Sequence, residues 1–293
     1  MNNFVINEKI LSHIDQIELL VKDNVAGRFG GTHKTKSYGS SCEFGDYREY
    51  IPGDDIRKID WGIFSRFEKL YLKLNLDERQ MHTRIYIDAS ASMDGINHEK
   101  SMLALQLASI FTYLSVKSMD KVSVYYIQND KIVEIISGII GKEAYLENIS
   151  KLSEIDFKGD CQLSKAIMGS KVGYGDGVSL IISDFLTDNN YENAIDHLRI
   201  KRRDVICMQL LSKDEMNPQL LGKYVYLDSE GAASYKKNIT KETLKSYQKA
   251  LDYVTKKLEV FCHSRNAQYL LVSTEDRLEE IIFSKLARKE IIK

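Results

Sequence analysis

The sequence has little proline, few cysteines, no long hydrophobic run and no excess of charge of either sign. Its only prolines are Pro52 and Pro218, so few segments are forced out of regular structure. No uninterrupted apolar run approaches the ~20 residues that a bilayer crossing needs. Charged residues interrupt the apolar ones in residues 1–23, a pattern typical of an amphipathic helix and not of a signal peptide. We therefore expect a soluble protein with no membrane span.

Cysteine spacing and charge exclude further classes of protein. The cysteines at positions 42, 161, 207 and 262 show no C-x-x-C spacing, which argues against a zinc site and a disulfide framework and fits a reducing cytoplasm. With 41 basic and 42 acidic side chains, the formal net charge is −1, so no global field attracts nucleic acid or an anionic membrane. A nucleophile elbow, a Walker A loop, a dinucleotide fingerprint and H-E-x-x-H are also absent, which argues against an enzyme.

Residues 1–80 are predicted to form an N-terminal elaboration of a helix, a loop and a strand. Residues 26–41 are rich in Gly, Ser and Lys without a hydrophobic period, which predicts a loop. In the segment KLYLKLNLDE, leucines alternate at positions 70, 72, 74 and 76, which predicts a strand with one buried face. We place the domain boundary after this strand, at residue 80.

Residues 81–293 alternate short apolar runs with longer amphipathic stretches, which is the pattern of βα units that build a parallel sheet covered on both faces. Strands are predicted at residues 84–87, 121–127, 178–182, 205–210 and 268–272, and helices at 98–117, 191–201, 241–264 and 275–289. A turn at Asn129 and Asp130 makes residues 132–136 an antiparallel partner of 121–127 at the sheet edge. Residues 224–227 are expected to extend the same scheme.

The sharpest chemical signal is the segment IYIDASASMDG, in which a predicted strand runs into Asp88, Ser90 and Ser92. Open α/β sheets bind ligands at the carboxyl ends of their strands. One carboxylate and two hydroxyls from a single turn suit a hard cation, and Mg²⁺ prefers few protein ligands and several waters. The competing interpretation is helix N-capping, because Ser and Asp routinely accept hydrogen bonds from the first amides of a helix.

A second carboxylate follows another apolar strand, since SLIISDFLTD places Asp184 at its end. Taken alone, this aspartate fits a cap or a turn better than a metal site. Two strands that end in aspartate over one crevice favour a paired metal site. An ion bound there would keep open positions and could accept a carboxylate from another protein.

Acidic, basic and aromatic side chains alternate closely in EFGDYREYIPGDDIRKIDW, residues 43–61. Mixed signs at this spacing predict bidentate Arg–carboxylate pairs that pin a loop. A partner-binding surface is the alternative interpretation. His33, alone among small and basic residues, indicates a structural or solvated histidine and not a catalytic one.

Residues 31–73, together with IDASASM and ISDF, closely resemble the domain of unknown function 58 family, whose members contain a von Willebrand factor A-like domain. The resemblance covers nearly the whole chain. It implies an α/β, von Willebrand factor A-like (Rossmann-like) fold with a mostly parallel sheet flanked by helices. The signature residues are Glu43, Phe44, Asp46, Arg48, Tyr50, Gly53, Asp54, Arg57, Asp60 and Trp61.

The resemblance also implies a metal-ion-dependent adhesion site. Asp88, Ser90 and Ser92 match its first motif, and Asp184 matches its last aspartate. In KGDCQLSKAI, Cys161 stands where related domains have a threonine, and a thiol is a poor ligand for Mg²⁺. Asp160 is the alternative donor, and the implied cofactor is weakly bound Mg²⁺ or Mn²⁺.

Family members resemble partners of MoxR-type AAA+ ATPases. The resemblance therefore implies a non-enzymatic adaptor that works with such an ATPase in the assembly or maturation of an unknown client protein. Two alternatives stay open. Cys161 favours a metal-free scaffold, and an aspartate after a hydrophobic strand also occurs in Mg²⁺-dependent phosphoryl-transfer enzymes. Those enzymes usually have a second acidic residue two positions later, where this chain has Ser90.

Overall fold

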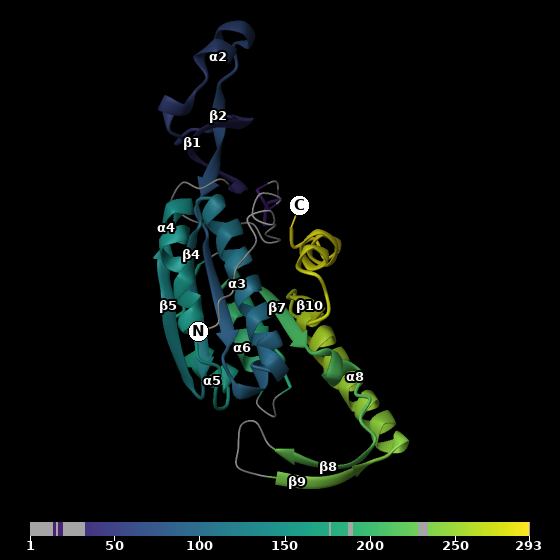
Figure 1. The fold of residues 1–293 in the computed structure, drawn as a ribbon. Coiled ribbons are helices and arrows are strands. Elements are labelled where there is room, and N and C mark those ends of the chain that lie inside the picture. The colour runs from purple at the N-terminus through teal and green to yellow at the C-terminus, as the bar shows by residue number, and fades with distance from the viewer. Residues whose placement is uncertain are drawn as a thin grey trace. The chain divides into compact units, whose positions relative to one another are not determined.

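The computed structural model describes residues 14, 15, 17–19, 33–175, 177–186, 190–227 and 234–292, of which 33–46, 74–79, 96, 226–227 and 234–235 are described by their backbone only. The chain forms two compact units, residues 1–22 with 82–293 and residues 23–81 (Figure 1). None of the described helices combines the length and hydrophobicity of a membrane-spanning helix. The domain boundary drawn at residue 80 stays a prediction.

The larger unit contains a six-stranded sheet in the order β10-β7-β6-β3-β4-β5. Its strands are β3 (His82–Asp88), β4 (Lys121–Gln128), β5 (Lys131–Ile139), β6 (Val178–Ser183), β7 (Asp204–Leu211) and β10 (Gln268–Ser273). Neighbouring strands are parallel except β5, which pairs antiparallel with β4 at the edge. The mostly parallel sheet with one antiparallel edge strand, expected from the sequence, is confirmed.

Helices cover the two faces of this sheet. They are α3 (Glu99–Lys117), α4 (Gly141–Asn148), α5 (Leu163–Gly169), α6 (Glu192–Ile200), α7 (Lys213–Met216), α8 (Lys241–Ser264) and α9 (Leu278–Glu280), with the short segments η2 (Ala91–Met93), η3 (Ile96–His98), η4 (Ile149–Glu154) and η5 (Ile281–Leu286). Along β3, Ile85 and Ile87 pack in one apolar core with α3, whereas Tyr86 packs in a second core with α5, α6 and α8. Successive side chains of a strand point to opposite faces, so the unit has helix, sheet and helix layers.

One expectation for this unit is corrected. The strand at residues 224–227, β8 (Gly222–Leu227), does not extend the sheet but pairs antiparallel with β9 (Ser234–Ile239) in a ribbon of its own. Lys223, Tyr224 and Val225 of β8 are all exposed, so this strand lacks the cover on both faces that a strand of the central sheet has. Separately, Cys207 and Cys262 are hydrogen-bonded to each other in the core as free thiols, so the residues described show no disulfide between them.

The smaller unit is an antiparallel pair of β1 (His33–Glu49) and β2 (Tyr71–Arg79), with η1 (Ile56–Lys58) and α2 (Trp61–Phe67) between them. The alternating leucines correctly predicted β2. The loop expected at residues 26–41 is wrong from His33 onward, because the main chain there pairs with β2 through several register shifts and needs no hydrophobic period. The predicted N-terminal helix lies mostly outside the described residues.

Candidate functional site

Two buried carboxylates meet at the carboxyl edge of the sheet. β3 and β6 are parallel neighbours with Ile87 opposite Ile182, so Asp88 at the end of β3 and Asp184 directly after β6 reach the same edge. Asp88 is 4% exposed and Asp184 is 3% exposed. Burial, and then the charge of Asp184, raise the pKa of Asp88 above its usual value. A bound cation would relieve this repulsion.

Hydrogen bonds fix the orientation of the Asp88 carboxylate. Ser183 Oγ donates to Asp88 Oδ2 over 2.6 Å, and Ser90 N donates to Asp88 Oδ1 over 2.9 Å. Ser183 lies on β6 and Ser90 on the turn that follows β3, so the carboxylate is held from two sides. Both hydrogen bonds partly counteract the rise in its pKa, because they stabilise the ionised form.

The hydroxyls of Ser90 and Ser92 lie side by side, 3.1 Å apart at their Oγ atoms. Ser90 is the N-cap residue of η2, yet its side chain makes no capping hydrogen bond. In an octahedral site with Mg–O distances of ~2.0–2.1 Å, neighbouring ligand oxygens lie about 2.9 Å apart. The observed spacing therefore suits two adjacent positions on such an ion, and capping does not account for the Ser90 side chain.

The loop before α5 brings Cys161 to Asp88. Its backbone is tied to the end of β4, where Asn129 N donates to Asp160 O over 2.6 Å. Burial, and then the carboxylate of Asp88 with its hydrogen bond to the thiol, raise the pKa of Cys161 far above its usual value. The sulfur therefore stays protonated and is a poor ligand for Mg²⁺. The alternative donor, Asp160, has its Oδ1 engaged by Cys161 N at 2.6 Å.

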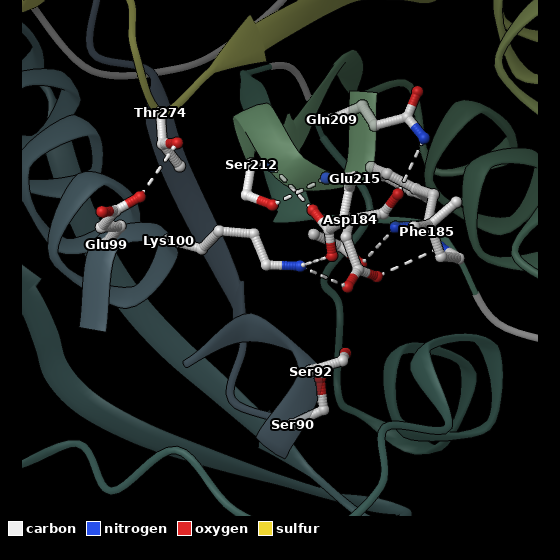
Figure 2. Close-up of polar contacts among 12 residues, drawn as sticks. Ser90, Ser92, Glu99, Lys100, Asp184, Phe185, Gln209, Ser212, Glu215 and Thr274 are labelled. Atoms are coloured by element: carbon white, nitrogen blue, oxygen red, sulfur yellow. Dashed lines mark hydrogen bonds and ion pairs between the residues drawn. The ribbon is translucent and has the colours of Figure 1, made fainter. Parts of the chain in front are cut away.

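A buried lysine contacts Asp184. Lys100, in the first turn of α3, is 1% exposed. Its Nζ donates to Asp184 Oδ2 over 3.0 Å and to Glu215 Oε1 over 2.7 Å, and Figure 2 shows the ammonium group between the two carboxylates. Burial lowers the pKa of Lys100, but the two carboxylates outweigh burial and raise it above its usual value. Asp184 Oδ1 accepts from Leu186 N at 3.1 Å, which is the turn role that the sequence left open.

Further hydrogen bonds position both partners of this lysine. Gln209 on β7 donates from Nε2 to Asp184 O over 2.8 Å and accepts from Tyr269 OH at 2.6 Å. Glu215 Oε2 accepts from Ser212 N at 2.7 Å within the capping box of α7. The carboxyl ends of β6 and β7, together with Tyr269 near the amino end of β10, thus contribute to one network.

Sequence reasoning missed four residues of this site, Lys100, Ser183, Gln209 and Glu215. The burial of Lys100 could have been predicted from its position in the helix. It precedes Leu103 and Leu107 by three and seven positions and so lies on the apolar stripe. A lysine on such a stripe needs a buried partner. Glu215 had a signal too, since Ser212 and Glu215 have the spacing of a capping box.

The donor set fits a hard cation in part. Across the described residues, no three histidine, cysteine, aspartate or glutamate side chains form a group that could hold a metal ion. Asp88, Ser90 and Ser92 offer one buried carboxylate and two adjacent hydroxyls, which suit Mg²⁺ or Mn²⁺. Cys161 does not fit, and Asp184 already pairs with Lys100.

The signature segment lies in the smaller unit, where its aspartates cap short helices. Asp55 Oδ1 accepts from Arg57 N at 3.0 Å at the start of η1. Asp60 Oδ1 accepts from Gly62 N at 2.9 Å and from Ile63 N at 3.1 Å at the start of α2. Arg57 Nε lies 3.9 Å from Asp55 Oδ1, too far for a hydrogen bond. The bidentate pairing expected from the sequence is therefore wrong for these aspartates.

Among the described side chains of this segment, one Arg–carboxylate pair is close enough for a hydrogen bond. Arg48 Nη2 donates to Asp54 Oδ1 over 2.7 Å, while Asp54 Oδ2 accepts from Ile51 N at 2.9 Å, so the pair is a single hydrogen bond. Gly53, in the same turn, has a φ of 108°, which favours glycine. Of the other signature residues, Glu43, Phe44 and Asp46 have their backbone in β1, Tyr50 is half-buried and Trp61 is 60% exposed.

The sequence profile of the family described as "Protein of unknown function DUF58" matches residues 46–256. The chain belongs to the DUF58 family. Among relatives of this DUF58 protein, the uncharacterized protein Rv1480 of Mycobacterium tuberculosis is 25% identical over 229 residues, which cover 76% of this chain and 71% of that protein. The family resemblance seen in the sequence is thereby confirmed.

Solved structures similar to this DUF58 protein include von Willebrand factor A domains. The conserved hypothetical protein BatB from Bacteroides thetaiotaomicron has a TM-score of 0.43 and 11% identity, covering 71% of this chain and 98% of that one. The VWA domain of SpRpn10 has a TM-score of 0.39 and 9% identity, covering 68% and 92%. The mussel byssus protein PTMP1, solved with a zinc-occupied MIDAS motif, has a TM-score of 0.38 and 10% identity, covering 73% and 48%. The larger unit has the α/β architecture expected from the sequence, a mostly parallel sheet flanked by helices.

Proposed function

We propose that this DUF58 protein is a non-enzymatic adaptor that captures an acidic side chain of a protein partner through Mg²⁺ or Mn²⁺. The observation that carries the proposal is the donor set after β3. Asp88 is buried and oriented by two hydrogen bonds, and the hydroxyls of Ser90 and Ser92 lie 3.1 Å apart without a capping role for Ser90. These three side chains would hold the ion, which would supply a Lewis acid for an outside carboxylate.

The chemistry of the three donors favours capture of an outside ligand. Asp88 contributes one negative charge, and the two serine hydroxyls are neutral, so the site satisfies a divalent charge only partly. The hydrogen bonds from Ser183 and Ser90 N keep the Asp88 carboxylate in place before any ligand arrives. A carboxylate from a partner protein supplies both the missing charge and a preferred oxygen donor.

The partner we propose is a MoxR-type AAA+ ATPase, with which the protein would act on an unknown client in the cytoplasm. The support is that members of the DUF58 family resemble partners of such ATPases. This chain belongs to that family, because the family's sequence profile matches residues 46–256. The thiols of Cys161, Cys207 and Cys262, free and buried, suit a reducing compartment.

A metal-free scaffold is the second candidate. Cys161 favours it, because a protonated thiol hydrogen-bonded to Asp88 stands where the adhesion-site pattern has a threonine. In that case the same surface would bind its partner by shape and hydrogen bonds alone. Partner capture would then survive removal of divalent cations.

A pull-down from lysate of the source organism separates the two candidates. Bait proteins are the wild type, Asp88→Ala and the matched control Asp130→Ala, each with Mg²⁺ or with EDTA, and mass spectrometry identifies the captured proteins. Asp130 also follows a strand of the sheet, but it pairs with the exposed Lys165 at 2.9 Å. Recovery of an AAA+ ATPase by the wild type and Asp130→Ala, only with Mg²⁺, supports the adaptor. Recovery in all conditions supports the scaffold.

A further inference from the structure

Lys100 is a cation that the protein itself supplies to the carboxyl edge of the sheet. Its ammonium group is 3.0 Å from Asp184 Oδ2 and 2.7 Å from Glu215 Oε1, and the lysine is 1% exposed (Figure 2). The three groups come from three separate elements, since Lys100 lies in the first turn of α3, Asp184 follows β6 and Glu215 belongs to α7. The ion pairs therefore join parts of the chain that only the fold brings together.

This ammonium group cannot easily leave its partners. An unpaired charge in the interior is strongly unfavourable, and two carboxylates compensate for the loss of water around Lys100. The partners are also fixed, because Gln209 Nε2 holds the backbone of Asp184 at 2.8 Å and the capping box of α7 holds Glu215 at 2.7 Å. Lys100 is thus a permanent, immobile positive charge beside the proposed ion site.

We infer that Lys100 is a positioning residue that withholds Asp184 and Glu215 from a divalent cation, so that Asp88 is the one carboxylate of the described chain that binds the ion directly. The inference rests on the proposed function and deepens it. An ion with a single protein carboxylate and two neutral hydroxyls lacks charge compensation from its own chain. A carboxylate from the partner then becomes its favoured further ligand, and Lys100 makes the site depend on that partner.

The test measures Mn²⁺ binding to the purified full chain by isothermal titration calorimetry, with no partner present. Lys100→Met keeps a long apolar stem and removes the charge. We expect Mn²⁺ to bind this variant at least about tenfold more tightly than wild type, because a freed carboxylate near the ion contributes Coulomb energy in a poorly solvated site. The matched control is Lys158→Met, which removes an exposed ammonium group paired with Asp156, and it should change the affinity by less than about twofold.

A double variant identifies the carboxylate responsible. Adding Asp184→Asn to Lys100→Met should return the Mn²⁺ affinity to the wild-type value. The inference is overturned if folded Lys100→Met binds Mn²⁺ as wild type does, or if its gain persists with Asp184→Asn.

Lys100→Met leaves two carboxylates without their cation, so its folding is checked by circular dichroism in EDTA. If it does not fold there, refolding on addition of Mn²⁺ supports the inference. The double variant Lys100→Met/Glu215→Gln, which has one unpaired carboxylate fewer, then provides the affinity measurement. Failure of both variants to exceed wild-type Mn²⁺ binding rejects the inference. Because no partner is present, a gain in Mn²⁺ affinity supports this role of Lys100 even if the wild type captures no ATPase.

Discussion

The two ends of the six-stranded sheet each bury a cation, and the two cations contact different kinds of group. At the amino ends of the strands, Arg203 is 3% exposed and donates from Nη2 to the main-chain oxygens of His82 and Val178, the first residues of β3 and β6. At the carboxyl ends, Lys100 is 1% exposed and donates to the side-chain carboxylates of Asp184 and Glu215. Arg203 ties strands together, whereas Lys100 pairs with two carboxylates at the edge where we propose that an ion binds.

The two buried cations therefore differ in what they contact, which is main-chain oxygens for Arg203 and carboxylates for Lys100. The planar guanidinium of Arg203 suits several fixed acceptors at once, and its Nε also donates to Ser179 Oγ over 3.1 Å. Gly177 leaves room for it, since a Cβ at that position would lie 2.7 Å from Arg203 Nη1. At the carboxyl edge, burial and then the charge of Asp184 instead raise the pKa of Asp88, an arrangement that favours binding of a cation.

The largest expected effect is at the amino end. Arg203→Met removes a buried cation and leaves the carbonyl oxygens of His82 and Val178 without this donor, so we expect a loss of about 3–5 kcal/mol in the free energy of unfolding. Urea titration at pH 7 in EDTA measures it. The control Arg202→Met removes an exposed guanidinium 5.5 Å from the Tyr174 ring centre and should lose no more than about 1 kcal/mol. Equal losses in the two variants would contradict the structural role of Arg203.

His82, whose carbonyl Arg203 contacts, should make stability depend on pH. Burial, and then the charges of Arg84, Arg203 and Lys121, lower the pKa of His82 from 6.5 to about 3. Between these values the unfolded chain binds a proton that the folded chain does not, so this contribution is complete above pH 6.5 and is lost as the pH falls toward 3. The slope is at most about 1.4 kcal/mol per pH unit.

The measurement compares wild type with His82→Gln by urea unfolding at pH 7, 6, 5 and 4. Gln keeps a polar group near Ser123 Oγ, which lies 3.1 Å from His82 Nε2. Other titrating groups are common to both proteins, so the difference between them isolates the histidine. Parallel pH profiles for the two proteins would show that His82 has the same pKa folded and unfolded.

The sequence predicted those features of the fold and the site that depend on neighbouring residues. Strands β3, β6 and β7 followed from apolar runs, because continuous hydrophobicity is needed where both faces are covered. Asp88 and Asp184 were correctly placed at strand ends for the same reason. The polar strands β1 and β9 were missed. Each pairs with its neighbour through main-chain hydrogen bonds and has no strong hydrophobic period in its sequence.

Contacts that depend on strand order could not be predicted. The burial of Lys100 could have been inferred from the hydrophobic stripe of α3, although our sequence analysis missed it. Its pairing with Glu215 could not, because that pairing requires β7 to lie on the far side of β6 from β3. Cys161 was aligned with a threonine by resemblance, and only the folded loop shows its thiol hydrogen-bonded to Asp88. In the signature segment, the same aspartates could form ion pairs or cap helices, and the sequence did not distinguish the two. Asp60, for example, caps α2 by accepting hydrogen bonds from Gly62 N and Ile63 N.

A pair of serines on β6 sharpens the comparison between the two ends. Ser183 Oγ donates to Asp88 Oδ2 and accepts from Phe185 N at 3.0 Å, whereas Ser179 Oγ accepts from Arg203 Nε. Each Ser→Ala change should lower the free energy of unfolding by about 1–3 kcal/mol, because a buried partner loses its hydrogen bond. Only Ser183→Ala should also weaken Mn²⁺ binding, by about tenfold, since it frees the Asp88 carboxylate to rotate. Equal Mn²⁺ affinities in the two variants would contradict a metal site at the carboxyl edge.

The smallest effect is expected for the ion pair of the smaller unit. Arg48 and Asp54 are joined at 2.7 Å, but their side chains are 43% and 23% exposed, so water and salt screen the pair. Arg48→Met should leave the unfolding midpoint unchanged within error. Asp54→Ala should lower it, because the carboxylate also accepts from Ile51 N in the turn that contains Gly53. Equal destabilisation by Arg48→Met and Asp54→Ala would show that the ion pair, and not the turn, is the source of stability. The degree of burial would then not explain why we expect Lys100 and Arg203 to contribute more to the free energy of unfolding than Arg48.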